Sequence, residues 1–163
     1  MDERFLKISR EMMLSEDRSE KGIITNDPKD PGGKTRWGVS QRSYPDVDLD
    51  SLTREGTLEL YYRDWYVRYH YDEIKDDELV AEILDIAVTN PHKAHECIQR
   101  AVITTMGEYL EVDGVMGPKT VAAINQHPNP AWLLDRFKLL AIEHYLGCRN
   151  DRFLAGWVRR ALD

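Results

Sequence analysis

A run of turn-forming residues interrupts the chain near its beginning: Thr25-Asn26-Asp27-Pro28-Lys29-Asp30-Pro31-Gly32-Gly33. Proline fixes φ at a value that suits turns, glycine allows positive φ, and Asn and Asp hydrogen-bond their own backbone. This composition predicts a loop or a short β-hairpin from Gly22 to Gly38. A structured loop of this length in a compact protein usually carries function.

Helical patterns lie on both sides of this loop. Phe5, Ile8 and Met12 recur at helical spacing and predict an amphipathic helix over residues 3–16. Further apolar repeats of the same period follow the loop. In one of them Asn90-Pro91 supplies an N-cap and a proline at the first helical position. The sequence therefore predicts a mainly α fold with one early loop or hairpin.

Length and charge exclude several classes of protein. A chain of 163 residues with 42% apolar content usually forms one compact domain. Lys and Arg number 22 against 29 Asp and Glu, a formal charge of −7, which argues against a protein that binds nucleic acid by neutralising phosphates. The first residues contain no apolar run of signal-peptide or membrane-span length, so we expect synthesis in the cytoplasm and no stable membrane insertion.

The sequence offers no convincing metal site. Cys97 and Cys148 form no CxxC pair and are predicted to be reduced thiols that pack as small apolar groups. His92 and His95 lie one helical turn apart, but no third ligand is evident. Three aspartates resemble the opening of a calcium loop, although Ser51 stands where that loop needs glycine: Asp46, Asp48 and Asp50. We therefore expect no metal and no cofactor.

Glu16 has the setting that a general acid needs. It ends the predicted first helix and continues the apolar stripe of Ile8 and Met12. The negative end of the helix dipole and the apolar neighbours both disfavour the ionised carboxylate, so its pKa is expected to rise. A raised pKa keeps a proton available near neutral pH, as acid catalysis requires. The alternative is a solvated glutamate at a helix end, which is common in proteins.

The loop and five later segments resemble one family in the same order along the chain. Asn26 to Ser40 is similar to the NDPxDPGGxTxxGIS segment of the glycoside hydrolase 108 family, which comprises lysozyme-like N-acetylmuramidases of phages and prophages, some labelled secretion activators. The other resembling segments run from Arg42 to Leu49, Tyr61 to Tyr66, Leu84 to Asn90, Val112 to Thr120 and Phe153 to Arg160.

The resemblance implies a fold, a division of the chain and a reaction. The fold is a lysozyme-like helical single domain. Residues 1–88 form the catalytic region, and residues 89–163 form a helical peptidoglycan-binding region packed into the same domain. The implied activity is that of an endolysin, which cleaves the β-1,4 bond between N-acetylmuramic acid and N-acetylglucosamine.

One departure from the family concerns the catalytic acid. Family members carry Glu-Gly-Gly at the end of the first helix, and this chain contains no such triplet. Glu20-Lys21-Gly22 nearly keeps the spacing to the loop, whereas Glu16 keeps the spacing from the apolar helix. Glu16 is preferred because apolar residues precede it by three and four positions, while Glu20 has Asp17 and Glu16 there. Glu20 remains the alternative acid.

Further candidate site residues lie in the early loop and in later segments of the chain. Asp30 is the expected second carboxylate, and Thr35 is expected to orient a water molecule; Asp30 can also simply cap a turn before Pro31. Gly32 and Gly33 let the backbone approach a sugar closely. The remaining candidate substrate-binding residues are aromatic or polar: Trp37, Tyr44, Asp85 and Asn90.

A second interpretation is a binding protein without activity. The altered Glu-Gly-Gly segment can leave a degenerate site, in which case the chain is an adaptor that binds peptidoglycan. In either case the expected partner is the glycan strand, with no nucleic acid, and the expected state is a monomer. Since no signal peptide is apparent, action at the cell wall or in the periplasm requires release through a holin or another route.

Overall fold

The computed structural model describes residues 1–16, 21–27, 32–107, 109–148, 154–156, 158 and 161–162, without the side chains of residues 11, 12 and 14–16. The backbone forms two compact units, Met1–Trp65 and Tyr66–Asp163. The predicted division into residues 1–88 and 89–163 stays a prediction. Among the described helices, none has the length and apolar character that crossing a membrane requires.

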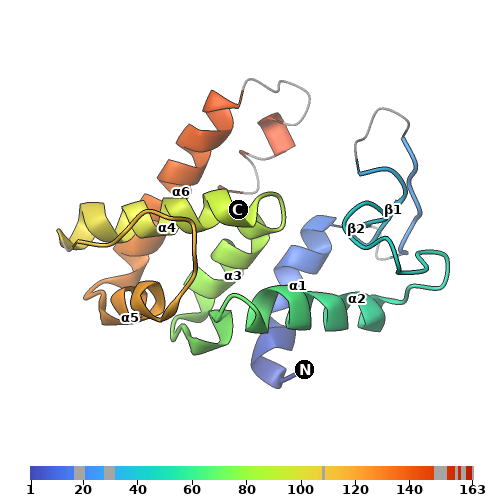
Figure 1. Ribbon diagram of the computed structural model, residues 1–163, viewed down its shortest axis with the longest axis horizontal. Helices are drawn as coiled ribbons and strands as arrows, with labels where there is room; N and C mark the ends of the chain where they lie inside the picture. The colour runs from blue at the N-terminus through green and yellow to red at the C-terminus, as the bar shows by residue number, and fades with distance from the viewer. Residues whose placement is uncertain are drawn as a thin grey trace. The chain divides into compact units, whose positions relative to one another are not determined.

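The described part of the first unit includes helices α1 and α2 and a small hairpin (Figure 1). Helix α1 spans Glu3–Glu16, the range expected from the sequence, and buries Phe5, Ile8 and Met13. Strands β1 (Thr35–Arg36) and β2 (Val39–Ser40) pair antiparallel. Helix α2 spans Arg54–Tyr61 and begins at Thr53, whose hydroxyl accepts a hydrogen bond from the Gly56 N–H. The expected mainly α fold with an early hairpin is confirmed.

A π-helix, η1 (Tyr62–Val67), follows α2 directly. Apolar residues recur at helical spacing in this segment, and that spacing does not distinguish an α-helix from a π-helix. In a π-helix the hydrogen bond runs from residue i to i+5, so each turn is wider and the following side chains are rotated relative to those of α2. Short π segments of this kind occur frequently at functional sites.

The second unit is a group of helices around α4. They are the 3-10 helix η2 (Tyr71–Glu73), α3 (Asp77–Ala87), α4 (Pro91–Met106), α5 (Pro118–Gln126) and α6 (Pro130–Gly147). Helix α4 packs against α6 and α3, and α5 packs against α4. Asn90 and Asn129 cap α4 and α6 as predicted, each followed by proline at the first helical position. The core of this unit includes Ile83, Ile98, Val102, Leu133 and Phe137, all completely buried.

Candidate active site

The hairpin closes through an unusual two-residue turn. Trp37 and Gly38, between β1 and β2, both have positive φ, 53° and 78°. Positive φ at both central residues is the signature of the type I′ turn, which matches the twist of the flanking strands. Glycine adopts this conformation freely, but an L-residue such as tryptophan is strained in it by about 1–2 kcal/mol. The hairpin therefore holds Trp37 in a conformation that its own backbone does not favour.

Thr35 pairs on both of its sides, with Thr25 in an isolated bridge and with Ser40 in the two-stranded sheet. Its N–H donates to the Thr25 carbonyl at 2.8 Å, and the Thr25 N–H donates to the Thr35 carbonyl at 2.9 Å. On the other side Thr35 pairs with Ser40. The Thr35 hydroxyl donates to the Gly33 carbonyl at 3.2 Å. Because its hydrogen is used in this way, the hydroxyl oxygen can act on a water molecule only as an acceptor.

Arg36 ties the hairpin to two distant segments of the first unit. Its Nε donates to the Gly22 carbonyl at 2.9 Å. Its Nη1 donates to the carbonyls of Leu49, at 3.1 Å, and Asp50, at 2.6 Å. A charged donor strengthens each of these bonds. The guanidinium thus fixes the backbone on both sides of the early loop, although the sequence motif alone did not indicate this role.

Trp37 packs against Gly22 so closely that no other residue fits there. A Cβ built on Gly22 would lie 2.3 Å from Trp37 Cε2, and the φ of Gly22 is 59°. The Trp37 side chain is buried, 8% exposed, and its Nε1–H has no hydrogen-bond partner among the described residues. Trp37 was expected to face a groove. In the structure its ring instead forms the packing surface for Gly22, and contact with a sugar stays a prediction.

Tyr44 belongs to a polar cluster beside η1. Its hydroxyl accepts a hydrogen bond from Trp65 Nε1 at 3.3 Å and also interacts with the Asp64 carboxylate. Asp64 in turn forms two hydrogen bonds with the Arg63 guanidinium, at 2.6 and 2.7 Å. Partial burial, followed by the negative charge of Asp64, raises the pKa of the Tyr44 phenol above its usual value. Tyr44 is therefore a half-buried, protonated phenol with a fixed orientation.

The expected catalytic carboxylates are placed only in part. Glu16 is the last residue of α1, but its side chain is outside the described residues. Glu20 and Asp30 also lie outside the described residues. Gly33 has a φ of 70°, with nothing within 4 Å of a Cβ built on it, so the requirement for glycine there is one of backbone conformation. Gly32 accepts a hydrogen bond from the Arg42 N–H at 3.4 Å.

Asp85 and Asn90 belong to the second unit. Asp85 is half-buried on α3. Asn90 is exposed, and its Oδ1 accepts a hydrogen bond from the Lys93 N–H at 3.2 Å, which identifies it as the N-cap of α4. Their contact with substrate stays a prediction.

The residues that resembled metal sites make ordinary protein contacts. The Asp48 carboxylate accepts hydrogen bonds from the Asp50 N–H and the Ser51 hydroxyl, and Asp50 pairs with Lys34 at 2.6 Å. His92 pairs with Glu96 at 3.1 Å. Within the described part of the chain, no three His, Cys, Asp or Glu side chains are grouped as metal ligands.

His95 supports a buried network that the sequence did not predict. Its Nδ1 lies 3.1 Å from the Gly114 carbonyl and must donate to it, so Nε2 accepts from the Tyr71 hydroxyl at 2.6 Å. Gln99 donates to Asp113 Oδ1 at 2.7 Å and accepts from the Gly114 N–H at 2.9 Å. These bonds anchor the Asp-Gly turn between α4 and α5. The Asp113-Gly114 pair indicates a turn from the sequence alone, but it does not indicate which side chains of α4 hydrogen-bond to that turn.

Comparison with known proteins found a family match for each of two parts of the chain. Residues 17–90 match the family model described as glycosyl hydrolase 108, and residues 93–162 match the model described as a predicted peptidoglycan domain. Residues 17–90 are thus a glycosyl hydrolase 108 region, and a predicted peptidoglycan domain follows it in the chain. This order agrees with the resemblance found in the sequence motifs. No curated protein matched the chain in sequence.

A solved structure shares the fold of the chain. The structure of Brucella abortus SagA superposes with a TM-score of 0.78 at 22% sequence identity, covering 96% of this chain and 88% of SagA. At this level of identity the similarity establishes the fold alone. The arrangement of the elements along nearly the whole chain is therefore one already seen in a solved protein.

Proposed function

We propose that the protein is an endolysin-like N-acetylmuramidase that hydrolyses the β-1,4 bond between N-acetylmuramic acid and N-acetylglucosamine. The observation that carries this proposal is the order of the two family matches, a glycosyl hydrolase region followed by a predicted peptidoglycan domain. A hydrolase joined to a domain of this kind has the bacterial cell-wall glycan as its natural substrate. The Thr35 hydroxyl and the half-buried Tyr44 supply polar and aromatic groups suited to a sugar.

Two observations favour Glu20 over Glu16 as the acid. The family match begins at residue 17, so it includes Glu20 and not Glu16. In addition, Gly22 must be glycine, because its φ is 59° and Trp37 occupies the space of a side chain. Gly22 thus corresponds to the last glycine of the family's Glu-Gly-Gly triplet, with Lys21 in place of the first. That alignment makes Glu20 the acid and reverses the preference drawn from helix amphipathicity.

The hairpin then has a defined role in catalysis. Arg36 holds the Gly22 carbonyl at 2.9 Å, and Trp37 packs on the Gly22 Cα. Both contacts fix the backbone two residues after Glu20. A general acid must be held within hydrogen-bonding distance of the oxygen it protonates, so a clamp at Gly22 serves positioning.

The proposed reaction follows the two-carboxylate scheme of glycosidases. The Glu20 carboxylic acid donates its proton to the glycosidic oxygen while the bond between that oxygen and C1 of N-acetylmuramic acid breaks, the electron pair going to the oxygen. The Asp30 carboxylate stabilises the positive charge that develops at C1. A water molecule whose hydrogen is accepted by Thr35 then bonds to C1 and loses a proton to a carboxylate of the site.

The remaining expected residues bind substrate in this proposal. Gly32 and Gly33 present backbone to the sugar, and Tyr44 offers the edge of its ring. Asp85 and Asn90 are proposed to contact the glycan strand through their polar side chains. The protein acts as a monomer on the glycan strand, and it reaches the cell wall or periplasm from the cytoplasm after release by a holin or a comparable route.

Glutamine variants of the two glutamates test the assignment. Glu20→Gln keeps the shape of the side chain and removes the transferable proton, so lysis of permeabilised cells should fall about a hundredfold or more. Glu16→Gln is the matched control and should retain lysis. Circular dichroism checks that both variants fold. Loss of lysis in Glu16→Gln with an active Glu20→Gln would return the assignment to Glu16, and wild-type rates in both would exclude either acid.

A specific observation supports a second candidate function. Lys21 replaces the first glycine of the triplet next to the proposed acid. A bulky cation there can leave the site inactive, and the protein would then be an adaptor that binds peptidoglycan without cleaving it. An inert wild-type protein that still sediments with purified peptidoglycan would favour this function; sustained release of reducing sugar ends would eliminate it.

A further inference from the structure

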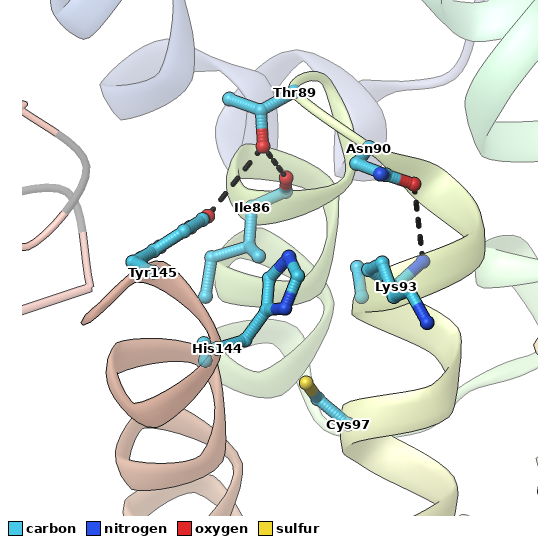
Figure 2. Close-up of a pocket in the computed structure, with 9 residues that line it drawn as sticks. Ile86, Thr89, Asn90, Lys93, Cys97, His144 and Tyr145 are labelled. Atoms are coloured by element: carbon cyan, nitrogen blue, oxygen red, sulfur yellow. Dashed lines mark hydrogen bonds between the residues drawn. The ribbon is translucent and has the colours of Figure 1, made fainter. Parts of the chain in front are cut away.

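The second unit contains a small pocket where the end of α3, the start of α4 and the end of α6 meet (Figure 2). Its walls come from these three helices and the short link between α3 and α4. The lining residues are Ile86, Thr89, Asn90, Lys93, Ala94, Cys97, Ala141, His144 and Tyr145. Six of these nine fall within the predicted peptidoglycan domain that starts at residue 93.

The pocket is suited to a small apolar group. The space between its walls is about 200 Å³, part of which is open to solvent, and its interior has room for about one water-sized group. The surface turned toward the inside is almost entirely carbon and sulfur. A water molecule needs two to four polar partners to be held in such a space. A methyl group needs none, and it gains from contact with Ala94, Cys97 and Ala141.

The groups around the pocket carry little net charge. Lys93 is neutralised by Glu96 at 2.8 Å. Burial, followed by the positive charge of Lys93, lowers the pKa of His144, so its ring is mostly neutral near pH 7. Burial raises the pKa of the Cys97 thiol to about 11, so it stays protonated. A neutral ligand is therefore favoured over an anion or a cation.

The rim offers hydrogen-bonding groups beside the apolar interior. The Thr89 hydroxyl donates to the Ile86 carbonyl at 2.8 Å and lies 3.5 Å from the Tyr145 hydroxyl. Asn90 lies next to it at the start of α4, and Figure 2 shows these groups along one edge of the pocket. An oxygen that has given its hydrogen away can still accept one, so this edge can bind an amide N–H.

We propose that this pocket binds the acetamido group of an N-acetylated sugar, with the methyl group inside and the amide at the Thr89 edge. This inference rests on the proposed function, in which the glycan strand is the substrate, and it adds a binding site in the second unit. The acetamido methyl stands at the end of a short arm that projects from the sugar ring. An alanine methyl of a stem peptide is attached directly to its backbone, which so small a pocket cannot admit.

Two neutral disaccharides with the same linkage test the proposal on the full-length protein. N,N′-diacetylchitobiose carries acetamido groups, and cellobiose carries hydroxyls in their place. In nitrogen-15 NMR titrations, the amides of Thr89, Lys93 and Ala94 should shift with diacetylchitobiose. Cellobiose should bind at least about fourfold more weakly there, since it lacks a buried methyl group. Equal shifts with both sugars, or shifts only with an alanine-containing stem peptide, would overturn the proposal.

A pair of valine variants on α6 provides the control. Ala141 lies in the pocket wall and is 1% exposed, so Ala141→Val fills the pocket and should weaken diacetylchitobiose binding about tenfold. Ala131 is exposed on the same helix, and Ala131→Val should bind like the wild type. Thr89→Val removes the edge hydroxyl and should weaken binding without filling the pocket. If Ala141→Val does not fold, the comparison of the two sugars on the wild type still tests the proposed site.

The outcome for the pocket is distinguishable from the outcome for the proposed function. The titration reports binding at named amides and needs no turnover. Lysis without shifts at the pocket would overturn this inference and leave the muramidase assignment in place. Shifts at the pocket from an inert protein would support the site and favour the adaptor function.

Discussion

Gly22 and Gly33 are both required to be glycine, but for different physical reasons. Gly22 has a φ of 59° and is covered by the Trp37 ring, whereas Gly33 has a φ of 70° and open space around it. The first position therefore combines backbone strain with steric overlap. The second involves backbone strain alone.

Alanine variants should separate these two contributions. Gly33→Ala should lower the free energy of unfolding by about 1 kcal/mol, the cost of a left-handed L-residue. Gly22→Ala should lower it by about 3 kcal/mol, since the Trp37 ring must also move. Urea unfolding followed by circular dichroism measures both values. Equal losses would contradict the packing of Trp37 against Gly22.

His95 links stability to pH. It is 1% exposed, and burial lowers its pKa from 6.5 to about 4. The unfolded chain therefore binds a proton before the folded protein does as the pH falls. The stability that neutral His95 contributes is complete above pH 6.5, decreases as the pH falls toward about 4, and is gone below that.

A variant that cannot titrate should remove this dependence. Between pH 7 and pH 4 the wild type should lose about 3 kcal/mol of unfolding free energy through His95. In His95→Gln the amide can still donate to the Gly114 carbonyl, and the loss over the same interval should be smaller by that amount. Urea titrations at several pH values give both curves. Parallel curves would show that His95 does not titrate in this interval.

At the scale of elements, α4 holds the turn that leads into α5. Gln99 donates to Asp113 Oδ1, the Val115 carbonyl and Thr120 Oγ1, and it accepts from the Gly114 N–H. Within the turn Met116 is buried, whereas Val115 is 59% exposed. The conformation of the turn therefore depends on α4, through His95 at the Gly114 carbonyl and above all through the Gln99 side chain.

Replacing that side chain should loosen the turn. Gln99→Leu leaves the buried Gly114 N–H without a partner, and we expect a loss of about 3 kcal/mol in unfolding free energy. Hydrogen exchange at the amides of Gly114 and Val115 should become faster. Arg100→Leu, at an exposed position one residue along α4, should change stability by less than about 0.5 kcal/mol. Unchanged exchange in Gln99→Leu would mean that the turn holds its own shape.

At the scale of the whole molecule, the net charge of −7 affects binding to the cell wall. Peptidoglycan and its attached polymers are mostly anionic, so the protein as a whole is repelled, and attraction must come from local contacts. Salt shortens the range of this repulsion from about 30 Å at 0.01 M to about 8 Å at 0.15 M.

Moderate salt should therefore help the enzyme. Raising sodium chloride from 0.01 to 0.15 M should leave the rate of lysis unchanged or raise it up to about threefold. Rates measured on isolated peptidoglycan, where cell integrity plays no part, are the appropriate readout. A steep fall in rate over this range would indicate a cationic binding surface and contradict the argument from net charge.

The sequence by itself determined the mainly α fold, the early hairpin, the caps of α4 and α6, and the family. These features depend on local preference: helical spacing places apolar residues on one face, Asn-Pro starts a helix, and Pro-Gly-Gly excludes one. The family motifs are likewise contiguous in the chain. Such signals lie within a few residues of each other and need no knowledge of distant contacts.

Only the tertiary structure decided which distant residues contact one another. Trp37 packs on Gly22, and Arg36 donates to the Gly22 carbonyl. Tyr44 lies beside the π-helix. Each of these contacts joins segments that are far apart in sequence. The amphipathic pattern of α1 favoured Glu16, because periodicity reports only the face of a helix. The proposal of Glu20 as the acid rests instead on the contact between Trp37 and Gly22, since steric exclusion between two distant residues has no counterpart in local spacing.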